Sequence, residues 1–284
     1  KYAACPFQFL GERIGSKKEN GELGEEVAAT SKGTLLHNTL AAFVKTYLQK
    51  KITQNDLGVL ELRLNDIFEE ECKKQVGNTI VDNELWHLEK QRIWQTLKRW
   101  LRFECAEQEA WQNYTPQAVE WDFGSVGLVL EDGKKVSLIG RIDRLDGDGE
   151  YIFITDYKQS TVPASNALDN GLDMQMPIYM LAVNQHFAGG KKIAGESYLD
   201  MKKFNHKPAL VFVATGNEKL PAPKDLVWEQ EKDKYEKIIK DYIEAIYAGK
   251  FMVAPKKCNK YCRLKDICRK SVLVNVEQEV KGDE

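Results

Sequence analysis

The stretch from Gly140 to Ser160 reads GRIDRLDGDGEYIFITDYKQS, and it decides how the rest of the chain is interpreted. It follows one apolar run, passes through Gly147-Asp148-Gly149 and returns through a second apolar run. A Gly-Asp-Gly turn between apolar runs is typical of a β-hairpin. Side chains alternate between the faces of a strand, so Asp156 and Lys158 project side by side at the end of the second strand.

Asp143 lies on the first strand of this predicted hairpin, where it can face Asp156 and Lys158. Two carboxylates that converge on one point form a hard-oxygen site suited to Mg²⁺ or Mn²⁺. A neighbouring ammonium can orient a water or stabilise the charge that develops on a phosphorane. The alternative is a solvated hairpin end, because an Asp-x-Lys pattern alone is a weak signal.

This constellation resembles the PD-(D/E)xK nuclease superfamily, in which an Asp precedes a hairpin and an Asp/Glu-x-Lys follows it. Asp143, Asp156 and Lys158 match these positions, although the usual Pro before the first Asp is absent. The Gly-Arg-Ile-Asp form is typical of the RecB-like branch, and most like the nuclease domain of AddB-type helicase-nucleases. The resemblance implies an α/β fold with a restriction-endonuclease-like mixed sheet flanked by helices.

Further positions match the same family. The resemblance assigns a metal-ligand role to His37, although a lone His beside an apolar stripe is commonly a core residue. It also implies that Glu120 joins the metal site as an additional acid; the alternative is the wet face of an edge strand. Gln175 and Tyr179, one turn apart on a helix predicted over 172–187, would approach the scissile phosphate and Lys158. They could equally be two half-exposed helix residues.

Four of the six cysteines lie near the ends of the chain: Cys5, Cys258, Cys262 and Cys268. Clustered thiols without a secretory signal more often bind metal than form disulfides. Iron-sulfur members of the RecB-like family have one Cys ahead of the core and three after it, usually as C-x2-C-x5-C. Here the last interval matches and the first has one extra residue. The resemblance implies a [4Fe-4S] cluster that ties the two ends of the chain together, and the extra residue leaves zinc or free thiols as alternatives. Cys72 and Cys105 are expected to be small core residues.

Length and composition favour one globular domain over residues 1–284, or two intimate subdomains, and the resemblance implies a single RecB-like nuclease domain. Apolar residues make up 43% of the 284 residues, enough to bury a substantial core. No apolar run reaches membrane-spanning length and no secretory signal is present, so cytoplasmic residence is expected. The missing initiator Met indicates a domain excised from a longer protein. After the hairpin and the helix that follows it, two strands are predicted over 193–201 and 208–214, then a long helix over 225–248.

Residues 52–115 are predicted to be a helical insertion ahead of the sheet. Two apolar stripes with helical spacing support this prediction: Leu57, Leu60, Leu64, Ile67 and Phe68, then Trp86, Ile93, Leu97, Trp100 and Leu101. Basic residues fall largely opposite the second stripe: Arg92, Lys98, Arg99 and Arg102. Such a face is usually just solvated, but interleaved Trp and Arg could line a single-strand channel.

The net charge of −2 provides no global attraction for nucleic acid, so a DNA footprint has to be local. The segment 250–270, which holds the three clustered cysteines, carries eight basic residues and one acid, Asp266. We expect DNA phosphates to pass near this basic cysteine-cluster segment.

The candidate metal site and the resemblance together imply a Mg²⁺- or Mn²⁺-dependent deoxyribonuclease, an exonuclease on DNA ends or single strands, in DNA repair or recombination. The chain contains no Gly-x-x-x-x-Gly-Lys-Ser/Thr loop, the ATP-binding motif that a helicase needs. Any ATP-driven unwinding must therefore come from elsewhere, and a helicase subunit or domain is an expected partner. The alternatives are a non-catalytic DNA-binding or scaffolding module that keeps the fold, and a CRISPR-adaptation nuclease.

Overall fold

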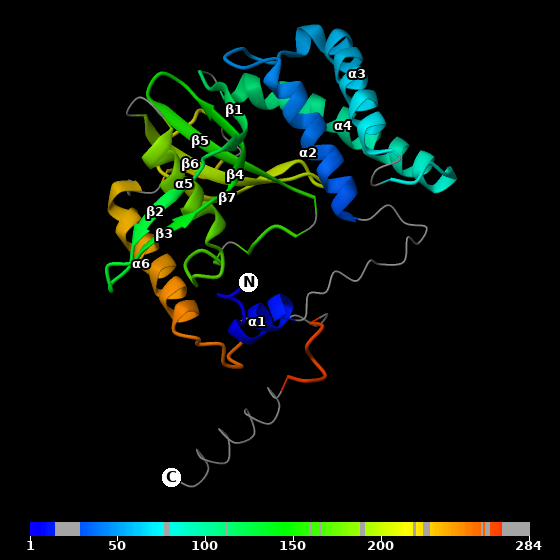
Figure 1. The fold of residues 1–284 in the computed structure, drawn as a ribbon. Helices are drawn as coiled ribbons and strands as arrows, with labels where there is room; N and C mark the ends of the chain where they lie inside the picture. Colours follow the sequence, from blue (N-terminus) through cyan, green and yellow to red (C-terminus); the bar gives the residue numbers. More distant parts are fainter. Residues whose placement is uncertain are drawn as a thin grey trace.

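The computed structural model describes residues 1–14, 29–76, 80–111, 113–159, 161–164, 166–187, 191–217, 220–223, 228–256, 258 and 262–268. Within these ranges the chain forms an α/β fold, with helices on both faces of a five-stranded mixed sheet (Figure 1). This is the restriction-endonuclease-like arrangement expected from the sequence. No helix in the described ranges combines the length and apolar character that a membrane span requires.

The sheet has the strand order β1-β4-β5-β6-β7. Its strands are β1 (Thr115–Asp122), β4 (Arg141–Gly147), β5 (Tyr151–Lys158), β6 (Lys192–Asp200) and β7 (Asn205–Val211). The central neighbours β5 and β6 are parallel, and the other neighbours in this sheet are antiparallel. The helix α5 (Gln175–His186) lies in the connection between the parallel strands, as a crossover requires.

The predicted hairpin is confirmed as β4 and β5. Gly147 pairs with Ile152 in the register, and the Asp148 amide donates a 3.1 Å hydrogen bond to the Tyr151 carbonyl. The apolar run before it differs from the prediction, because it forms a separate hairpin of β2 (Val126–Val129) and β3 (Lys135–Leu138). The chain then turns at Gly140, where a Cβ atom would lie 2.6 Å from the Phe123 ring. Glycine permits this close approach, so β4 begins only after it.

Two apolar layers cover the sheet. On one face, α5 and α6 (Trp228–Tyr247) pack against the side chains of β5 that point their way, such as Ile152 and Ile154. On the other face lies a helical layer that contacts Tyr157 and Leu199. That layer consists of α2 (Ala29–Lys45), the short 3₁₀ turn η1 (Gln54–Asp56), α3 (Leu57–Gln75) and α4 (Glu84–Ala110).

The region predicted to be helical throughout is two long helices with a break between them. Both predicted stripes are mainly buried, including Leu64 in α3 and Trp100 in α4. After the break, α4 begins at an N-cap residue, Asn83, whose side chain accepts a 2.8 Å hydrogen bond from the Trp86 backbone amide. Asn is a favoured N-cap because its side chain satisfies an amide that the helix leaves unpaired.

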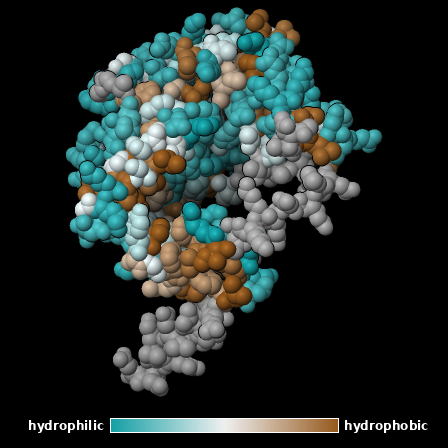
Figure 2. Space-filling model, viewed as in Figure 1, coloured by the Kyte–Doolittle hydropathy of each residue, from teal (hydrophilic) through white to brown (hydrophobic). Residues whose placement is uncertain are grey.

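The N-terminal helix α1 (Pro6–Ile14) lies beside the chain that follows α6 (Figure 1). The Tyr2 hydroxyl donates a 2.6 Å hydrogen bond to the Lys250 carbonyl, and its ring packs against Tyr242 and Phe251. Figure 2 shows hydrophobic residues gathered where these segments meet, below a largely hydrophilic main body. The two ends of the described chain are thus held together by aromatic packing.

Candidate active site

Three candidate metal ligands converge where β4 begins. The register of β1 on β4 places Glu120 across from Asp143. His37, from α2, has its Nδ1 atom 3.4 Å from Asp143 Oδ2 and 4.0 Å from Glu120 Oε1. One ligand atom from each residue lies within 4.8 Å of the others, and the described residues contain no other such group of His, Cys, Asp or Glu. An imidazole nitrogen and two carboxylate oxygens are suited to a divalent cation.

Glu120 is held in an unusual backbone conformation. Its φ of 46° lies in the left-handed region, which non-glycine residues rarely adopt. Such strain costs on the order of 1–3 kcal/mol and concentrates at functional sites. Arg141 Nη1 lies 3.3 Å from Glu120 Oε2, so the second carboxylate oxygen is held by an exposed guanidinium.

The imidazole of His37 lies among carboxylates that favour its protonated form. Burial lowers the pKa of its imidazole, but the hydrogen bond to Asp143 and the nearby carboxylates outweigh burial and raise that pKa overall. A divalent cation would replace this proton, because a histidine binds metal only in its neutral form.

The second predicted acid, Asp156, is bound by a different set of groups. Its Oδ2 atom lies 2.7 Å from Lys158 Nζ, and its Oδ1 atom accepts a 2.7 Å hydrogen bond from Gln175 Nε2. Gln175 Oε1 accepts a 3.1 Å hydrogen bond from Lys158, and Gln175 Nε2 lies 2.6 Å from Tyr179 Oη. The single amide of Gln175 therefore joins both catalytic candidates of β5 to α5.

A backbone contact connects the two sets. The Tyr157 amide donates a 2.8 Å hydrogen bond to Asp143 Oδ2, the same atom that faces His37. Burial, and then the charge of Asp143, raise the pKa of Asp156 to about 6, while Lys158 acts in the opposite direction. Lys158 is 24% exposed, so a substrate phosphate can reach its ammonium group. The site combines a cation-binding group, a buried acid and an accessible lysine.

Comparison with known proteins agrees with this arrangement. A family model described as the PD-(D/E)XK nuclease superfamily matches residues 1–269. The chain belongs to this superfamily. A curated relative in Clostridioides difficile (strain 630), named as a subunit of an ATP-dependent helicase/deoxyribonuclease, is 31% identical over 199 residues, covering 64% of this chain and 17% of that protein.

Proteins of the same name are similar in two other bacteria. The one from Clostridium tetani (strain Massachusetts / E88) is 26% identical over 205 residues, covering 68% of this chain and 18% of that protein. The one from Caldanaerobacter subterraneus subsp. tengcongensis is 29% identical over 209 residues, covering 67% and 17%. This nuclease-superfamily chain thus spans less than a fifth of the length of these relatives.

Two residues that the sequence did not single out, Tyr198 and Asp173, lie next to Lys158 and Gln175. The Lys158 ammonium lies 5.1 Å from the ring centroid of Tyr198 on β6. The Tyr198 hydroxyl donates a 2.7 Å hydrogen bond to one carboxylate oxygen of Asp173. The other oxygen accepts a 3.1 Å hydrogen bond from the backbone amide of Gln175. The alternation of β6 could have placed Tyr198 on the face of Lys158, but its partner Asp173 comes from a loop.

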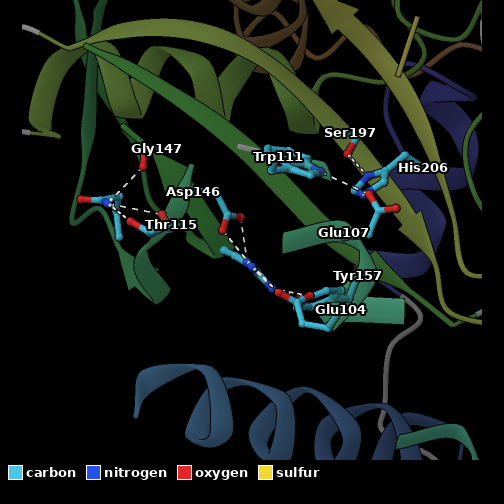
Figure 3. Close-up of polar contacts among 11 residues, drawn as sticks. Glu104, Glu107, Trp111, Thr115, Asp146, Gly147, Tyr157, Ser197 and His206 are labelled. Atoms are coloured by element: carbon cyan, nitrogen blue, oxygen red, sulfur yellow. Dashed lines mark hydrogen bonds and ion pairs between the residues drawn. The ribbon is translucent and has the colours of Figure 1, made fainter. Parts of the chain in front are cut away.

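A second polar layer lies on the opposite face of the sheet, between β4 and α4 (Figure 3). Arg144 donates hydrogen bonds to both carboxylate oxygens of Glu104, at 2.7 and 2.9 Å. It also bonds both oxygens of Asp146, and its Nη1 donates to the Tyr157 hydroxyl at 3.2 Å. This layer contacts β5 through Tyr157, the residue next to Asp156.

The four cysteines predicted to be cluster ligands differ in how far they are buried. Cys5 is buried and accepts a 3.5 Å hydrogen bond from the Gln8 amide. Cys258 is exposed, and Cys262 and Cys268 are partly buried. Gly11 of α1 lies so close to Leu264 that a Cβ atom would be 2.3 Å from it. The N-terminal helix therefore touches the segment that holds Cys262 and Cys268.

The four terminal cysteines offer the thiolate donors that a [4Fe-4S] cluster or a zinc ion takes. In the described part of the chain, no three thiols lie within 4.8 Å of one another. The residues fit either group in the kind of ligand that they provide.

The two remaining cysteines are core residues, as predicted. Cys72 and Cys105 are buried among the helices of the α2–α4 layer. Burial raises the pKa of Cys72 to about 12 and that of Cys105 to about 11. Both stay as protonated thiols at neutral pH, so neither is a reactive or ligating group.

Proposed function

We propose that this chain is the nuclease domain of a DNA-processing enzyme that hydrolyses phosphodiester bonds with the help of Mg²⁺ or Mn²⁺. The observation that carries the proposal is the convergence of His37, Glu120 and Asp143 beside the Asp156–Lys158 pair. The relatives are named as deoxyribonuclease subunits, which supports DNA rather than RNA as substrate. Their names also support a helicase as partner. A role in DNA repair is part of the proposal.

His37, Glu120, Asp143 and Asp156 would hold the cation. Bound there, Mg²⁺ or Mn²⁺ supplies Lewis-acid stabilisation of the phosphate charge and lowers the pKa of a water. The Lys158 ammonium would orient the attacking water, whose oxygen bonds to phosphorus in line as the bond to the 3′ oxygen breaks. The water gives up a proton to solvent, and the leaving 3′ oxygen takes one from solvent. The products are a 3′-hydroxyl and a 5′-phosphate.

Gln175 and Tyr179 have positioning roles in this proposal. The Gln175 amide donates to Asp156 and accepts from Lys158, so it fixes the acid and the water-orienting lysine relative to each other. Tyr179 fixes the Gln175 side chain in turn, through the 2.6 Å contact to its Nε2 atom. Both residues thereby limit how far Lys158 can move from the phosphate.

Cys5, Cys258, Cys262 and Cys268 are proposed to hold a [4Fe-4S] cluster, with zinc as the alternative. We assign the cluster a structural role, because these residues lie in the terminal segments and the acids lie on the sheet. Part of the basic segment around it, including Lys257 and 259–261, lies outside the described residues. Cytoplasmic residence stays a prediction from the sequence.

A non-catalytic DNA-binding or scaffolding module is the second candidate. Such a module keeps the fold and the cluster but has no need for a complete catalytic set. The intact Asp143, Asp156 and Lys158 favour the enzyme, because a decayed site usually loses one of them. The helicase/deoxyribonuclease names of the relatives favour a nuclease that works with a helicase over a CRISPR-adaptation nuclease.

The test is cleavage of end-labelled single- and double-stranded DNA with and without Mg²⁺ or Mn²⁺. Asp156→Ala removes one ligand charge, so cleavage should fall about 100-fold or more while the fold persists. Lys158→Ala should lower turnover more than DNA binding. Asp241→Ala, an exposed acid on α6, is the matched control and should cleave normally. Undiminished cleavage by the Asp156 variant, with contaminating nuclease excluded, would refute the assignment.

A further inference from the structure

The turn between β6 and β7 lies at the same edge of the sheet as the catalytic lysine. In the parallel register of β5 and β6, Lys158 pairs with Asp200. The next amide, that of Met201, donates a 2.9 Å hydrogen bond to the Lys158 carbonyl. The residues that follow immediately are Lys202 and Lys203, both exposed. Two lysines therefore extend the edge at which β5 ends.

The conformation of this turn is fixed by its own hydrogen bonds. Asp200 Oδ1 accepts bonds from the amides of Lys202 and Lys203, at 2.8 and 3.1 Å. The Phe204 amide donates a 2.7 Å bond to the Asp200 carbonyl, with Phe204 at a φ of 50°. The Asp200 carboxylate thus bonds the backbone of the turn, and the side chains of Lys202 and Lys203 are exposed to solvent.

The helix α4 adds two arginines to the turn. The Arg99 guanidinium lies 4.8 Å from the ring centroid of Phe204, and its Nη2 atom donates to the Lys202 carbonyl at 3.5 Å. Arg102 follows one helical turn later and is exposed. Arg99, Arg102, Lys202 and Lys203 together form what we term the basic ridge.

The charges of the basic ridge are not neutralised by neighbouring acids. Elsewhere on the helical layer, basic residues pair with carboxylates, as in Arg92–Glu89 at 2.6 Å and Lys98–Glu61 at 3.9 Å. Among the residues that the structure describes, no carboxylate lies within 4.0 Å of a basic-ridge nitrogen. Four uncompensated cations at one edge stand out in a chain with a net charge of −2.

We propose that the basic ridge binds the phosphodiester backbone of the DNA strand whose scissile phosphate lies at Lys158. The ligand class follows from the groups present: cations fixed on a turn and a helix face match successive phosphates. The ridge consists of cations and contacts phosphates rather than bases, and the Arg99 guanidinium lies over the Phe204 ring, so little sequence preference is expected. The inference rests on the proposed nuclease function and adds the direction of the strand, from β5 toward the helical layer.

The test measures DNA binding without cleavage. A fluorescein-labelled single-stranded oligonucleotide is titrated with the full chain in EDTA, and anisotropy is followed over a series of salt concentrations. For Lys202→Glu/Lys203→Glu we expect an affinity lower by about tenfold or more, and a log–log salt slope smaller by about 1.5, as for two lost phosphate contacts. The matched control is Lys135→Glu/Lys237→Glu, which changes the same number of exposed charges on β3 and α6.

Equal affinities for the ridge variant and the control variant would overturn the proposal. So would a wild-type affinity that does not depend on salt. Circular dichroism checks the fold; if the glutamate pair misfolds, Arg102→Glu and Lys202→Gln/Lys203→Gln decide the matter, because Arg102 lies outside the turn. A wild-type chain that binds through the ridge but never cleaves with Mg²⁺ or Mn²⁺ would defeat the proposed nuclease function and leave the ridge standing.

Discussion

Asp156 has to be ionised to bind a cation, yet its side chain is almost fully buried. Burial and the neighbouring Asp143 raise its pKa to about 6, so the protonated form persists to a higher pH than for an ordinary aspartate. His37 has its pKa raised by the surrounding carboxylates, so it too binds a proton more readily than usual. At both residues a proton and a divalent cation compete for the same atoms.

We therefore expect the affinity of the metal-free protein for Mn²⁺ to fall as the pH falls. With a pKa of about 6 for Asp156, its ionised fraction drops about tenfold between about pH 7 and pH 5, and protonation of His37 adds to the loss. Calorimetric titration at several pH values measures the change. The Asp156→Asn variant should bind more weakly with a shallower pH dependence, and an affinity constant down to pH 5 would contradict the prediction.

Part of the site could be predicted from the sequence. The alternation of a strand was enough to put Asp156 and Lys158 side by side, because that pattern is local. Whether Glu120 faced the site depended on the register between β1 and β4, which a single sequence does not specify. The bridge through Gln175 depends on how α5 crosses the sheet, and that is a tertiary property.

Among the elements, Asp173 joins β6 to the start of α5, because it accepts hydrogen bonds from the Tyr198 hydroxyl and the Gln175 backbone amide. Tyr198→Phe keeps the ring beneath Lys158 but leaves Asp173, which is 8% exposed, without its hydroxyl donor. We expect a loss of about 1–3 kcal/mol in the free energy of unfolding, because a buried acceptor loses its partner. Turnover should fall several-fold while DNA affinity is kept, since the start of α5 carries Gln175.

Tyr235→Phe is the matched control for that variant. Tyr235 is also buried, but its hydroxyl has no hydrogen-bond partner in the described residues, so removing it should not destabilise the protein. Denaturant unfolding and steady-state cleavage measure the two effects. Equal stability and turnover for the two variants would show that the Asp173 bond does not position the lysine.

A buried ion pair joins the helical layer to the sheet. Arg144 and Glu104 are only 5% and 4% exposed, and Asp146 would be the remaining acid for Arg144 in Glu104→Ala. We expect that substitution to lower the free energy of unfolding by about 3–5 kcal/mol, because it leaves a buried charge with fewer partners. Glu61→Ala, which breaks the longer and more exposed pair with Lys98, should change it by about 0–1 kcal/mol. Thermal or urea unfolding of both variants makes the comparison.

The elements themselves were predictable where their signals are local. Helical stripes indicated α3 and α4, and the Gly-Asp-Gly turn indicated the β4–β5 hairpin. The β2–β3 hairpin was missed because its strands have only four residues each and the apolar run at Val136 merges with the next strand in the sequence. The Arg144–Glu104 pair could not be foreseen, since the two residues are 40 positions apart.

At the scale of the whole molecule, the first residues of the chain meet the segment that follows α6. The sequence predicted this meeting from the cysteines, whereas the structure shows it through Tyr2, Phe9 and Phe251, which pack on one another. Aromatic residues near the termini were a signal for this contact. Their partners in the long helix α6 could be identified only once the fold was known.

The proposed cluster would tie Cys5 to Cys258, Cys262 and Cys268. Such a tie closes a loop of about 250 residues and restricts the unfolded chain, which favours the folded state. Cys5→Ser should therefore lower the melting temperature and weaken DNA binding, because the basic segment 250–270 loses its attachment. The catalytic acids on β4 and β5 should stay intact, so the variant should keep its affinity for Mn²⁺.

Anaerobically purified protein should be brown, with broad absorbance near 400 nm and about four irons per chain, as expected for a Cys₄-ligated cluster. Cys72→Ser is the matched control: its thiol is buried in the helical layer, and the variant should keep its iron and its colour. Colourless protein with one zinc would keep the structural tie and change the type of metal site. A Cys5→Ser variant with unchanged melting temperature and iron content would show that Cys5 is no ligand, and the aromatic contacts of Tyr2 would then be what holds the ends of the described chain together.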